Sequence, residues 1–475
     1  MTEGRRFSKE SSIYVVGEFL SRSLTFILLP IYAVYLSEED FAVLSLVAMI
    51  WPVMLIVIGQ GFSAYIFRGY FDYSDKKRFF GTILIFSMAL GFVTAFGIHL
   101  IGPWLFDRIF KEIDYKPYLQ YGVVFAVFRL FFNHVVSLYR AKREALTSVM
   151  LSFVLFFAQF ASVLVAIYLL RTDLLGILKA QIVGYIFVSV VYAMKMYSDI
   201  DFHFQSEVIR PCLSFVYPLY VHAIASWAVV YISRIFIERD MSLVDLATFS
   251  VASQIAMILS VINVGLNQAW APFVYSNVQK NDFMQLFTVN SRKLVVFIVL
   301  LSGCIILFTR EMLLLMQKAA YLSAQGILPI LMLAYFFQLI YFIYVAIIVY
   351  NKNTKILSVI SVGSGAVCVL LNAVLVPLWG MVGAAFCTAV SFFLMLVLVR
   401  GVTKKYIRVR LINWRIWVFI FCVCAAVGIS YFWIDPMALP YRIVLKLLIV
   451  FGLLRMLGVL KLFNIKDFFA TFFQK

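Results

Sequence analysis

Glu18 and Arg22 are the two residues best placed to do chemistry, because both fall inside an apolar stretch at residues 11–36. They stand four positions apart, so on a helix they share one face, which Ser21 and Thr25 extend. At 1.5 Å per residue, Arg22 lies roughly 16 Å into the stretch, near the midplane of a hydrocarbon core about 30 Å thick. A charge at that depth predicts either a functional site or a structural ion pair with a neighbouring helix.

Four further basic residues lie within apolar stretches. Arg129 is central in its stretch and Asn133 follows one helical turn later, a pattern that favours a cation-lined cavity over a buried structural contact. Lys179, Arg234 and Lys446 lie within about two turns of a helix end, where a long side chain can reach the membrane surface. Reaching the surface is therefore the favoured interpretation for these three, and lining a cavity is the alternative.

Amide and imidazole side chains complete the candidate set. Asn263 and Asn267 share one helix face, and each alone is typical of a hydrogen bond between helices. Together with the cations they predict a water-filled, positively charged chamber suited to a phosphate and hydroxyl-rich headgroup. Glu18, His134 and His222 could take up a proton or a cation if transport is coupled to a proton or sodium gradient, and structural roles are equally open.

The elements that must position these residues are transmembrane helices. The chain has 475 residues, 64% of them hydrophobic and 13% charged, which predicts an all-α integral membrane protein. About fourteen apolar stretches are long enough to cross a bilayer. They are residues 11–36, 40–66, 79–106, 117–139, 145–170, 174–196, 211–237, 245–275, 286–309, 321–350, 355–377, 380–399, 414–434 and 440–463.

Basic residues cluster at the N-terminus and in every second connection thereafter. The largest groups are at residues 5–9, 68–78, 140–143 and 400–415. Because the inner side of a membrane retains positive loops, this pattern predicts an even number of crossings with both termini in the cytoplasm. The net charge of +17 then reflects topology and attraction to anionic membrane lipids, and we expect no nucleic-acid partner.

An internal repeat indicates two lobes. Residues 36–75 align with residues 241–280 at a constant offset, and in both copies a Ser followed three positions later by an Asp predicts a capped helix start. Six crossings separate the copies, so they share one orientation and would be related by an axis along the membrane normal. The predicted parts are an N-terminal lobe at 1–197, an inner linker at 198–210, a C-terminal lobe at 211–400 and a C-terminal helix pair at 401–475.

The sequence offers no constellation typical of a soluble enzyme. It has no Walker loop, no His-Glu-x-x-His, no Gly-x-Ser-x-Gly and only four scattered histidines, so we expect neither catalysis nor a metal or organic cofactor. Connections between the apolar stretches are short, which counts against a membrane glycan polymerase or ligase, since such enzymes need a sizeable extramembrane region.

Three patches carry a family resemblance. The first is residues 11–69, which include Ser21-Arg22, LPIY at 29–32 and LSEEDF at 36–41. The others are residues 267–272 (NQAWAP) and residues 371–377 (LNAVLVP) with the glycines that follow. The chain resembles the polysaccharide-repeat flippases (Wzx-type) of the multidrug, oligosaccharidyl-lipid and polysaccharide exporter superfamily. It departs from the family pattern at Ala42, where a Gly is common after the acidic turn.

The resemblance implies a flippase of the bacterial inner membrane that carries undecaprenyl-pyrophosphate-linked oligosaccharide units to the outer leaflet by alternating access. Arg22 and Arg129 would then contact the pyrophosphate, Glu18 would tune Arg22, and Lys179 and Arg234 would guide binding or release. Membrane lipids and polysaccharide polymerase machinery are the implied partners. The alternatives are an exporter of another lipid-linked precursor or of a small molecule, and a glycan polymerase or ligase.

Overall fold

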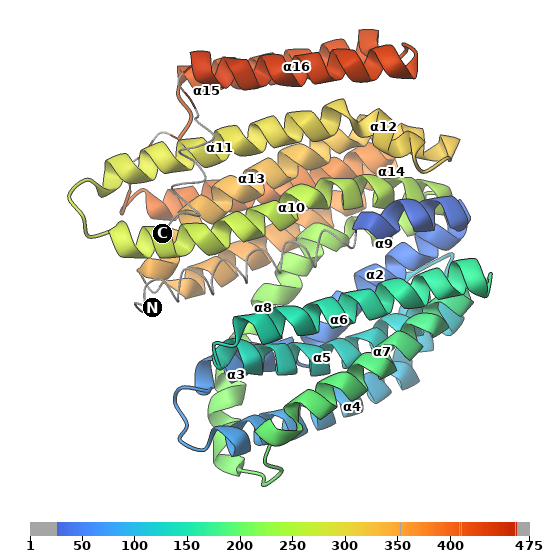
Figure 1. The fold of residues 1–475 in the computed structure, drawn as a ribbon, viewed down its shortest axis with the longest axis vertical. Coiled ribbons are helices and arrows are strands. Elements are labelled where there is room, and N and C mark those ends of the chain that lie inside the picture. The colour runs from blue at the N-terminus through green and yellow to red at the C-terminus, as the bar shows by residue number, and fades with distance from the viewer. Residues whose placement is uncertain (1–25, 352, 408, 410, 461, 463–475) are drawn as a thin grey trace. The chain divides into compact units, whose positions relative to one another are not determined.

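The computed structural model describes residues 26–351, 353–407, 409, 411–460 and 462 (Figure 1). In this described part the chain forms helices and turns without a strand. Within these residues, eleven helices are long and apolar enough to cross a membrane, which confirms the all-α membrane fold. Glu18 and Arg22 lie outside the described residues.

The chain divides into two compact units. The first contains Met1–Ser250 with Val369–Gly380, and the second contains Val251–Cys368 with Met381–Lys475. All three cuts, at residues 250/251, 368/369 and 380/381, fall inside long helices, so a helix can belong to both units. The lobe boundaries expected from the repeat stay a prediction.

The first unit holds the N-terminal helices, and α5 (Gln120–Ala141) lies at their centre, in contact with α2, α3, α4, α6 and α7. This position explains why α5 buries residues on most of its circumference. The other helices of the unit are Phe26–Tyr35, α2 (Glu38–Ile58), α3 (Gln60–Gly69), α4 (Lys76–Ile109), α6 (Ala145–Leu164), α7 (Leu174–Met196), α8 (Ile209–Tyr231), α9 (Ser233–Asp240) and the start of α10 (Leu243–Asn277).

The second unit holds the C-terminal helices. Within it α11 packs against α13 and α15, and α15 packs against α16. The helices are the remainder of α10, α11 (Phe283–Leu307), α12 (Thr309–Leu314), α13 (Ala324–Tyr350), most of α14 (Thr354–Thr403), α15 (Trp414–Ile429) and α16 (Leu439–Val459).

The number of candidate spans differs from the fourteen predicted stretches for identifiable reasons. Gly380 interrupts α14 with a left-handed backbone (φ +56°), so this one element covers two predicted stretches. A Cβ at Gly380 would lie 2.9 Å from the Met241 methyl carbon, which is the movable end of a flexible side chain, so the positive φ is what requires glycine here. The helix α16 is not among the eleven because it carries three basic residues. The first predicted stretch is not among them because only its Phe26–Tyr35 part is described, which is too short to cross a membrane.

Both predicted helix caps are present. The Ser37 hydroxyl accepts a hydrogen bond from the Asp40 backbone N–H (3.0 Å) at the start of α2. At the start of α10, Ser242 accepts from the Asp245 N–H (3.1 Å), and the Asp245 carboxylate accepts from the Ser242 N–H (3.2 Å) and hydroxyl (2.6 Å). The Ser-x-x-Asp pattern thus opens both helices, with the reciprocal box complete in the second copy.

Two equivalent positions of the repeat touch each other. Ser250 donates a hydrogen bond to Ser45 (Oγ–Oγ 2.9 Å), and both side chains are buried. Their separation in sequence equals the offset of the repeat, 205 residues. This hydrogen bond joins the second turn of α10 to α2.

The linker between α7 and α8 lies along the first turns of α4. The Asp201 N–H donates to the Lys77 carbonyl (3.2 Å), and the Gln205 N–H donates to the Thr82 hydroxyl (3.0 Å). These bonds fix the linker to the same unit as the helices that precede it.

Candidate functional site

Arg129 lies in the middle of α5 among aromatic side chains from two other helices. Its Nε donates a hydrogen bond to the Tyr185 hydroxyl of α7 (3.3 Å). The guanidinium carbon lies 5.1 Å from the ring centroid of Trp51 of α2 and 5.8 Å from that of Tyr185. Aromatic faces attract a guanidinium and leave most of its N–H donors free.

Arg129 lies near the middle of its apolar span. The apolar span runs from Tyr115 to Ala141, so Arg129 lies roughly 18–21 Å from either end at 1.5 Å per residue. Among the described residues no carboxylate lies within ion-pairing distance of its guanidinium. A half-buried cation at this depth, with free donors, is a site that favours an anion.

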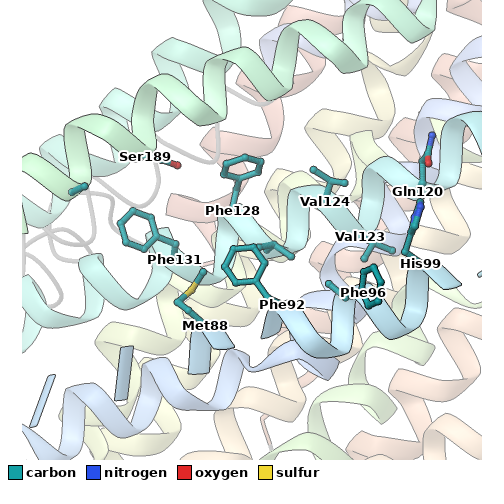
Figure 2. A pocket seen from close by; sticks show the side chains of 13 residues that line it. Met88, Phe92, Phe96, His99, Gln120, Val123, Val124, Phe128, Phe131 and Ser189 are labelled. Carbon is teal, nitrogen blue, oxygen red and sulfur yellow. The ribbon is translucent and has the colours of Figure 1, made fainter. Parts of the chain in front are cut away.

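An apolar groove opens on another side of α5. It has a volume of about 590 Å³ and lies between α4 and α7, with α5 as its floor. Figure 2 shows the rings of Phe92, Phe128 and Phe131 close together within it, with His99 and Gln120 at one end. Along α4 the groove extends eleven residues from Met88 to His99, about 16 Å, which is about half of a 30 Å hydrocarbon core.

Tyr185 lies between the cation and the groove. Its ring stacks on Phe128, which lines the groove, at 5.4 Å between centroids and 8° between planes. The hydroxyl of the same tyrosine accepts the hydrogen bond from Arg129. One buried side chain therefore separates an anion-favouring position from a surface suited to a hydrocarbon chain.

The other predicted site residues of the first unit are dispersed. Asn133 lies one turn from Arg129 and is partly exposed, whereas Lys179 is exposed six residues before Tyr185. Arg234 is buried in α9, where its guanidinium lies 5.1 Å from the Tyr231 ring and donates to the Val230 carbonyl (3.4 Å). The structure therefore brings together Arg129 and Asn133 and leaves Lys179 and Arg234 in different surroundings.

The two candidate histidines differ in their hydrogen bonding. His134 is completely buried, with Nδ1 2.8 Å from the Ser63 hydroxyl and Nε2 2.7 Å from the Ser87 hydroxyl. Both ring nitrogens of His134 are thus satisfied by neutral groups. His222 is half-buried in α8, and its Nδ1 has no hydrogen-bond partner in the described part of the chain.

The two asparagines lie in the second unit. The side-chain amide of Asn263 donates to the Tyr335 carbonyl (2.8 Å) and to Gln338 (3.1 Å), so it joins α10 to α13. Its Oδ1 is buried without a partner among the described residues. Asn267, one turn later, is partly exposed.

A buried ionic cluster in the second unit has no counterpart in the sequence-based expectations. The Lys446 ammonium of α16 contacts Glu311 (2.8 Å) and Asp435 (2.7 Å), and Arg442 Nε lies 2.7 Å from Glu311. Gln325 of α13 also donates to Asp435. Two carboxylates and two cations meet here, and the cluster fastens α16 to α12 and α13.

This cluster overturns the expectation that Lys446 reaches the membrane surface. Its side chain is completely buried, because the two carboxylates supply partners that water would otherwise supply. The same expectation is wrong for Arg234, whose side chain is 3% exposed. Lys179 is exposed, as a lysine reaching the surface would be.

Glu238 anchors the connection that follows α4. Its carboxylate is buried and accepts hydrogen bonds from the Lys111 N–H (2.9 and 3.0 Å) and the Glu112 N–H (2.6 Å). Such bonds satisfy a buried carboxylate without a basic side chain. The sequence could have indicated this residue only as an acid near the end of an apolar stretch.

Comparison with known proteins assigns the family. The profile of a family described as polysaccharide biosynthesis protein matches residues 7–278, more than half of the chain. The chain belongs to this family. A relative from the Lsg locus of Haemophilus influenzae is 27% identical over 284 residues, which cover 58% of this chain and 68% of that protein. An uncharacterized membrane protein of the same organism is 24% identical over 282 residues, covering 58% of this chain and 66% of that protein.

Solved transporters share the fold of this family member. The lipid II flippase MurJ, in an inward closed conformation, is similar with a TM-score of 0.69 and 16% identity, covering 94% of this chain and 98% of MurJ. An inward-facing MATE family multidrug resistance transporter of the MOP superfamily has a TM-score of 0.64 and 15% identity, covering 81% of this chain and 96% of the transporter. Both neighbours are membrane transporters by their descriptions, and this chain shares their fold.

Proposed function

We propose that this protein is a flippase that moves oligosaccharide units linked to undecaprenyl pyrophosphate from the inner to the outer leaflet of the bacterial inner membrane. The family, and a fold shared with a lipid II flippase, support a transporter of a lipid-linked precursor. In this proposal both termini are cytoplasmic, as the distribution of basic residues predicts.

The position and surroundings of Arg129 are the main support for the proposal. Keeping a cation in the middle of an apolar span is costly, and the described structure supplies aromatic faces and one phenol oxygen instead of a carboxylate. A diphosphate group would add charge-assisted hydrogen bonds to the free N–H donors. Binding a phosphorylated headgroup would therefore offset the free-energy cost of keeping the Arg129 cation within the apolar span.

The groove between α4, α5 and α7 supports the lipid part of the proposal. Its lining is almost wholly apolar and aromatic, and its length matches about one leaflet. A hydrocarbon chain of the substrate lying in this groove would remain on the far side of Tyr185 from Arg129. The unit thus offers separate surroundings for the two chemically different ends of a lipid-linked sugar.

The remaining predicted roles belong to the same proposal. Arg22 and Glu18 would assist Arg129 at the pyrophosphate, and Asn133, Asn263 and Asn267 would contact hydroxyl groups. Lys179 and Arg234 would act during binding or release. Coupling to a proton or sodium gradient would involve Glu18, His134 or His222.

Replacing Arg129 by Met tests the proposal, because Met keeps an apolar side chain of similar length and removes the charge. We expect at least a tenfold loss of surface polysaccharide in cells that carry Arg129→Met as their only copy, with lipid-linked oligosaccharide accumulating in the inner leaflet. Leaflet position would be read by accessibility to an impermeant glycan-modifying enzyme in right-side-out and inverted vesicles.

Arg108→Met is the matched control. Arg108 also lies on an aromatic ring, 4.3 Å from the centroid of Trp104, but it is exposed in the last turn of α4. Normal surface polysaccharide in Arg129→Met cells, at equal protein levels, would refute the assigned role.

The alternatives make different predictions for the same cells. An exporter of small cations would favour an acidic site, whereas the described surroundings of Arg129 are cationic and aromatic. A glycan polymerase or ligase would leave unpolymerised units in the outer leaflet when inactivated. Polysaccharide polymerase machinery is the partner we propose for the flippase itself.

A further inference from the structure

A second pocket of the first unit is polar and lies at the end of α5, far from the groove. It has a volume of about 400 Å³ and is lined by aromatic residues and basic side chains from two connections. The lining residues are Tyr70, Phe71, Lys76, Ala141, Lys142, Arg143 and Glu144. Arg129 lies fourteen residues before Arg143 on the α5 side, roughly 21 Å away along the helix, so the two sites are separate.

The charges in this pocket are only partly compensated. Lys142 pairs with Asp199, and the Glu144 carboxylate accepts a hydrogen bond from the Thr147 hydroxyl (3.0 Å). In the part of the chain that the structure describes, neither Lys76 nor Arg143 pairs with a carboxylate. Two cations therefore remain available to an anion that enters the pocket.

Arg143 has a left-handed backbone conformation, which is unfavourable for a residue with a Cβ. Arg143 has φ +60° and ends α5 in a Schellman motif, in which the Glu144 N–H donates to the Tyr139 carbonyl (2.9 Å) and the Arg143 N–H to the Arg140 carbonyl (3.1 Å). Glycine is the residue that usually takes this position, because it has no Cβ to clash. Arg143 therefore occupies this position at a cost in stability.

The aromatic residues shape the pocket for a group at the membrane surface. The Lys76 ammonium lies 4.8 Å from the ring centroid of Tyr70, which orients the cation and leaves its N–H donors free. Phe71 is 58% exposed beside it. A basic pocket edged by exposed aromatic rings suits a charged headgroup whose hydrocarbon chains remain in the membrane.

We propose that this pocket binds the phosphate group of an anionic membrane lipid, with Arg143 and Lys76 as the principal ligands. The guanidinium of Arg143 can bind two phosphate oxygens at once, and Lys76 adds a point charge. This binding is independent of transport and of Arg129.

Lipid binding by the purified full-length protein in dodecyl maltoside tests the proposal. Native mass spectrometry and thermal shift would be followed during titration with dioleoyl phosphatidic acid, dioleoyl phosphatidylcholine and inorganic phosphate. We expect phosphatidic acid to bind at least tenfold more tightly than phosphatidylcholine and to raise the melting temperature. Equal stabilisation by inorganic phosphate would overturn the assignment to a lipid.

Two arginine-to-glycine variants separate binding from folding. Arg143→Gly should weaken phosphatidic acid binding about tenfold while its melting temperature without lipid stays equal or rises, because glycine suits the left-handed backbone. Arg171 is the matched control, since it is exposed and also left-handed (φ 48°) but does not line the pocket. The proposal is wrong if Arg171→Gly weakens binding as much as Arg143→Gly, or if Arg143→Gly binds like the wild type.

Discussion

Replacing Lys446 by Met should destabilise the second unit strongly. The Lys446 side chain is completely buried and neutralises two carboxylates, so its removal leaves two acids and one arginine in the cluster. Breaking a buried ion pair by removing one partner costs about 3–5 kcal/mol, because a desolvated charge is left without compensation. That corresponds to a decrease of roughly 150- to 4,000-fold in the folding equilibrium constant.

Thermal unfolding with a thiol-reactive dye would measure this loss, because Cys368 and Cys387 are buried. Adding Asp435→Asn to Lys446→Met restores electrical neutrality, and we expect the double variant to recover about 1–3 kcal/mol. Arg455→Met is the control on the same helix, since Arg455 is exposed and lies over the Phe451 ring. A Lys446→Met protein that unfolds at the same temperature as the Arg455→Met control would show that the cluster contributes little.

Two further predictions concern the linker between α7 and α8. A Cβ on Gly81 would lie 1.9 Å from the Asp201 carbonyl oxygen, so Gly81→Ala should lower the free energy of unfolding by about 1–3 kcal/mol, measured by thermal unfolding. Gly97→Ala is the control on the same helix, and it should leave the stability unchanged because no atom lies within 4 Å of the added Cβ. The hydrogen bond from His203 (2.5 Å) lowers the pKa of Asp201 below its usual 3.8. The ionised Asp201 carboxylate therefore stabilises the linker above about pH 4, and this stabilisation is lost as the pH falls through the lowered pKa. Hydrogen exchange of the His203 N–H, which donates to Asp201 (3.0 Å), should show protection at pH 5 that disappears on acidification, and Asp201→Asn should abolish this dependence.

The helices were predictable because their signals are local. Long apolar stretches fix most spans to within a few residues, and a Ser-x-x-Asp pattern marks the starts of α2 and α10. The interruption at Gly380 also follows from a glycine soon after a proline in an otherwise apolar run. Each of these features depends on neighbours in sequence, so one chain suffices to find it.

The partners of the charged residues were not predictable, because they depend on tertiary contacts. The sequence identifies Arg129 as a candidate by its depth and by Asn133 one turn later, yet its surroundings come from Trp51 and Tyr185, which belong to other helices. Glu311 and Asp435 lie near helix ends, where acids are usually solvated, and only the packing of α12, α13 and α16 brings them to Lys446. The length of an apolar stretch locates a helix in the sequence, but it does not identify the residues of other helices that contact its charged side chains.

The carboxylate of Glu238 has a practical consequence for topology mapping. Because it holds the backbone amides of Lys111 and Glu112, an epitope tag inserted in that short connection would strip a buried acid of its donors and disturb α9 as well. Reporter sequences meant to reveal which face is extracellular therefore belong elsewhere in the unit. If a tag at residues 111–112 abolished expression, the cause would be loss of the hydrogen bonds to Glu238. The result would then not show on which side of the membrane this connection lies.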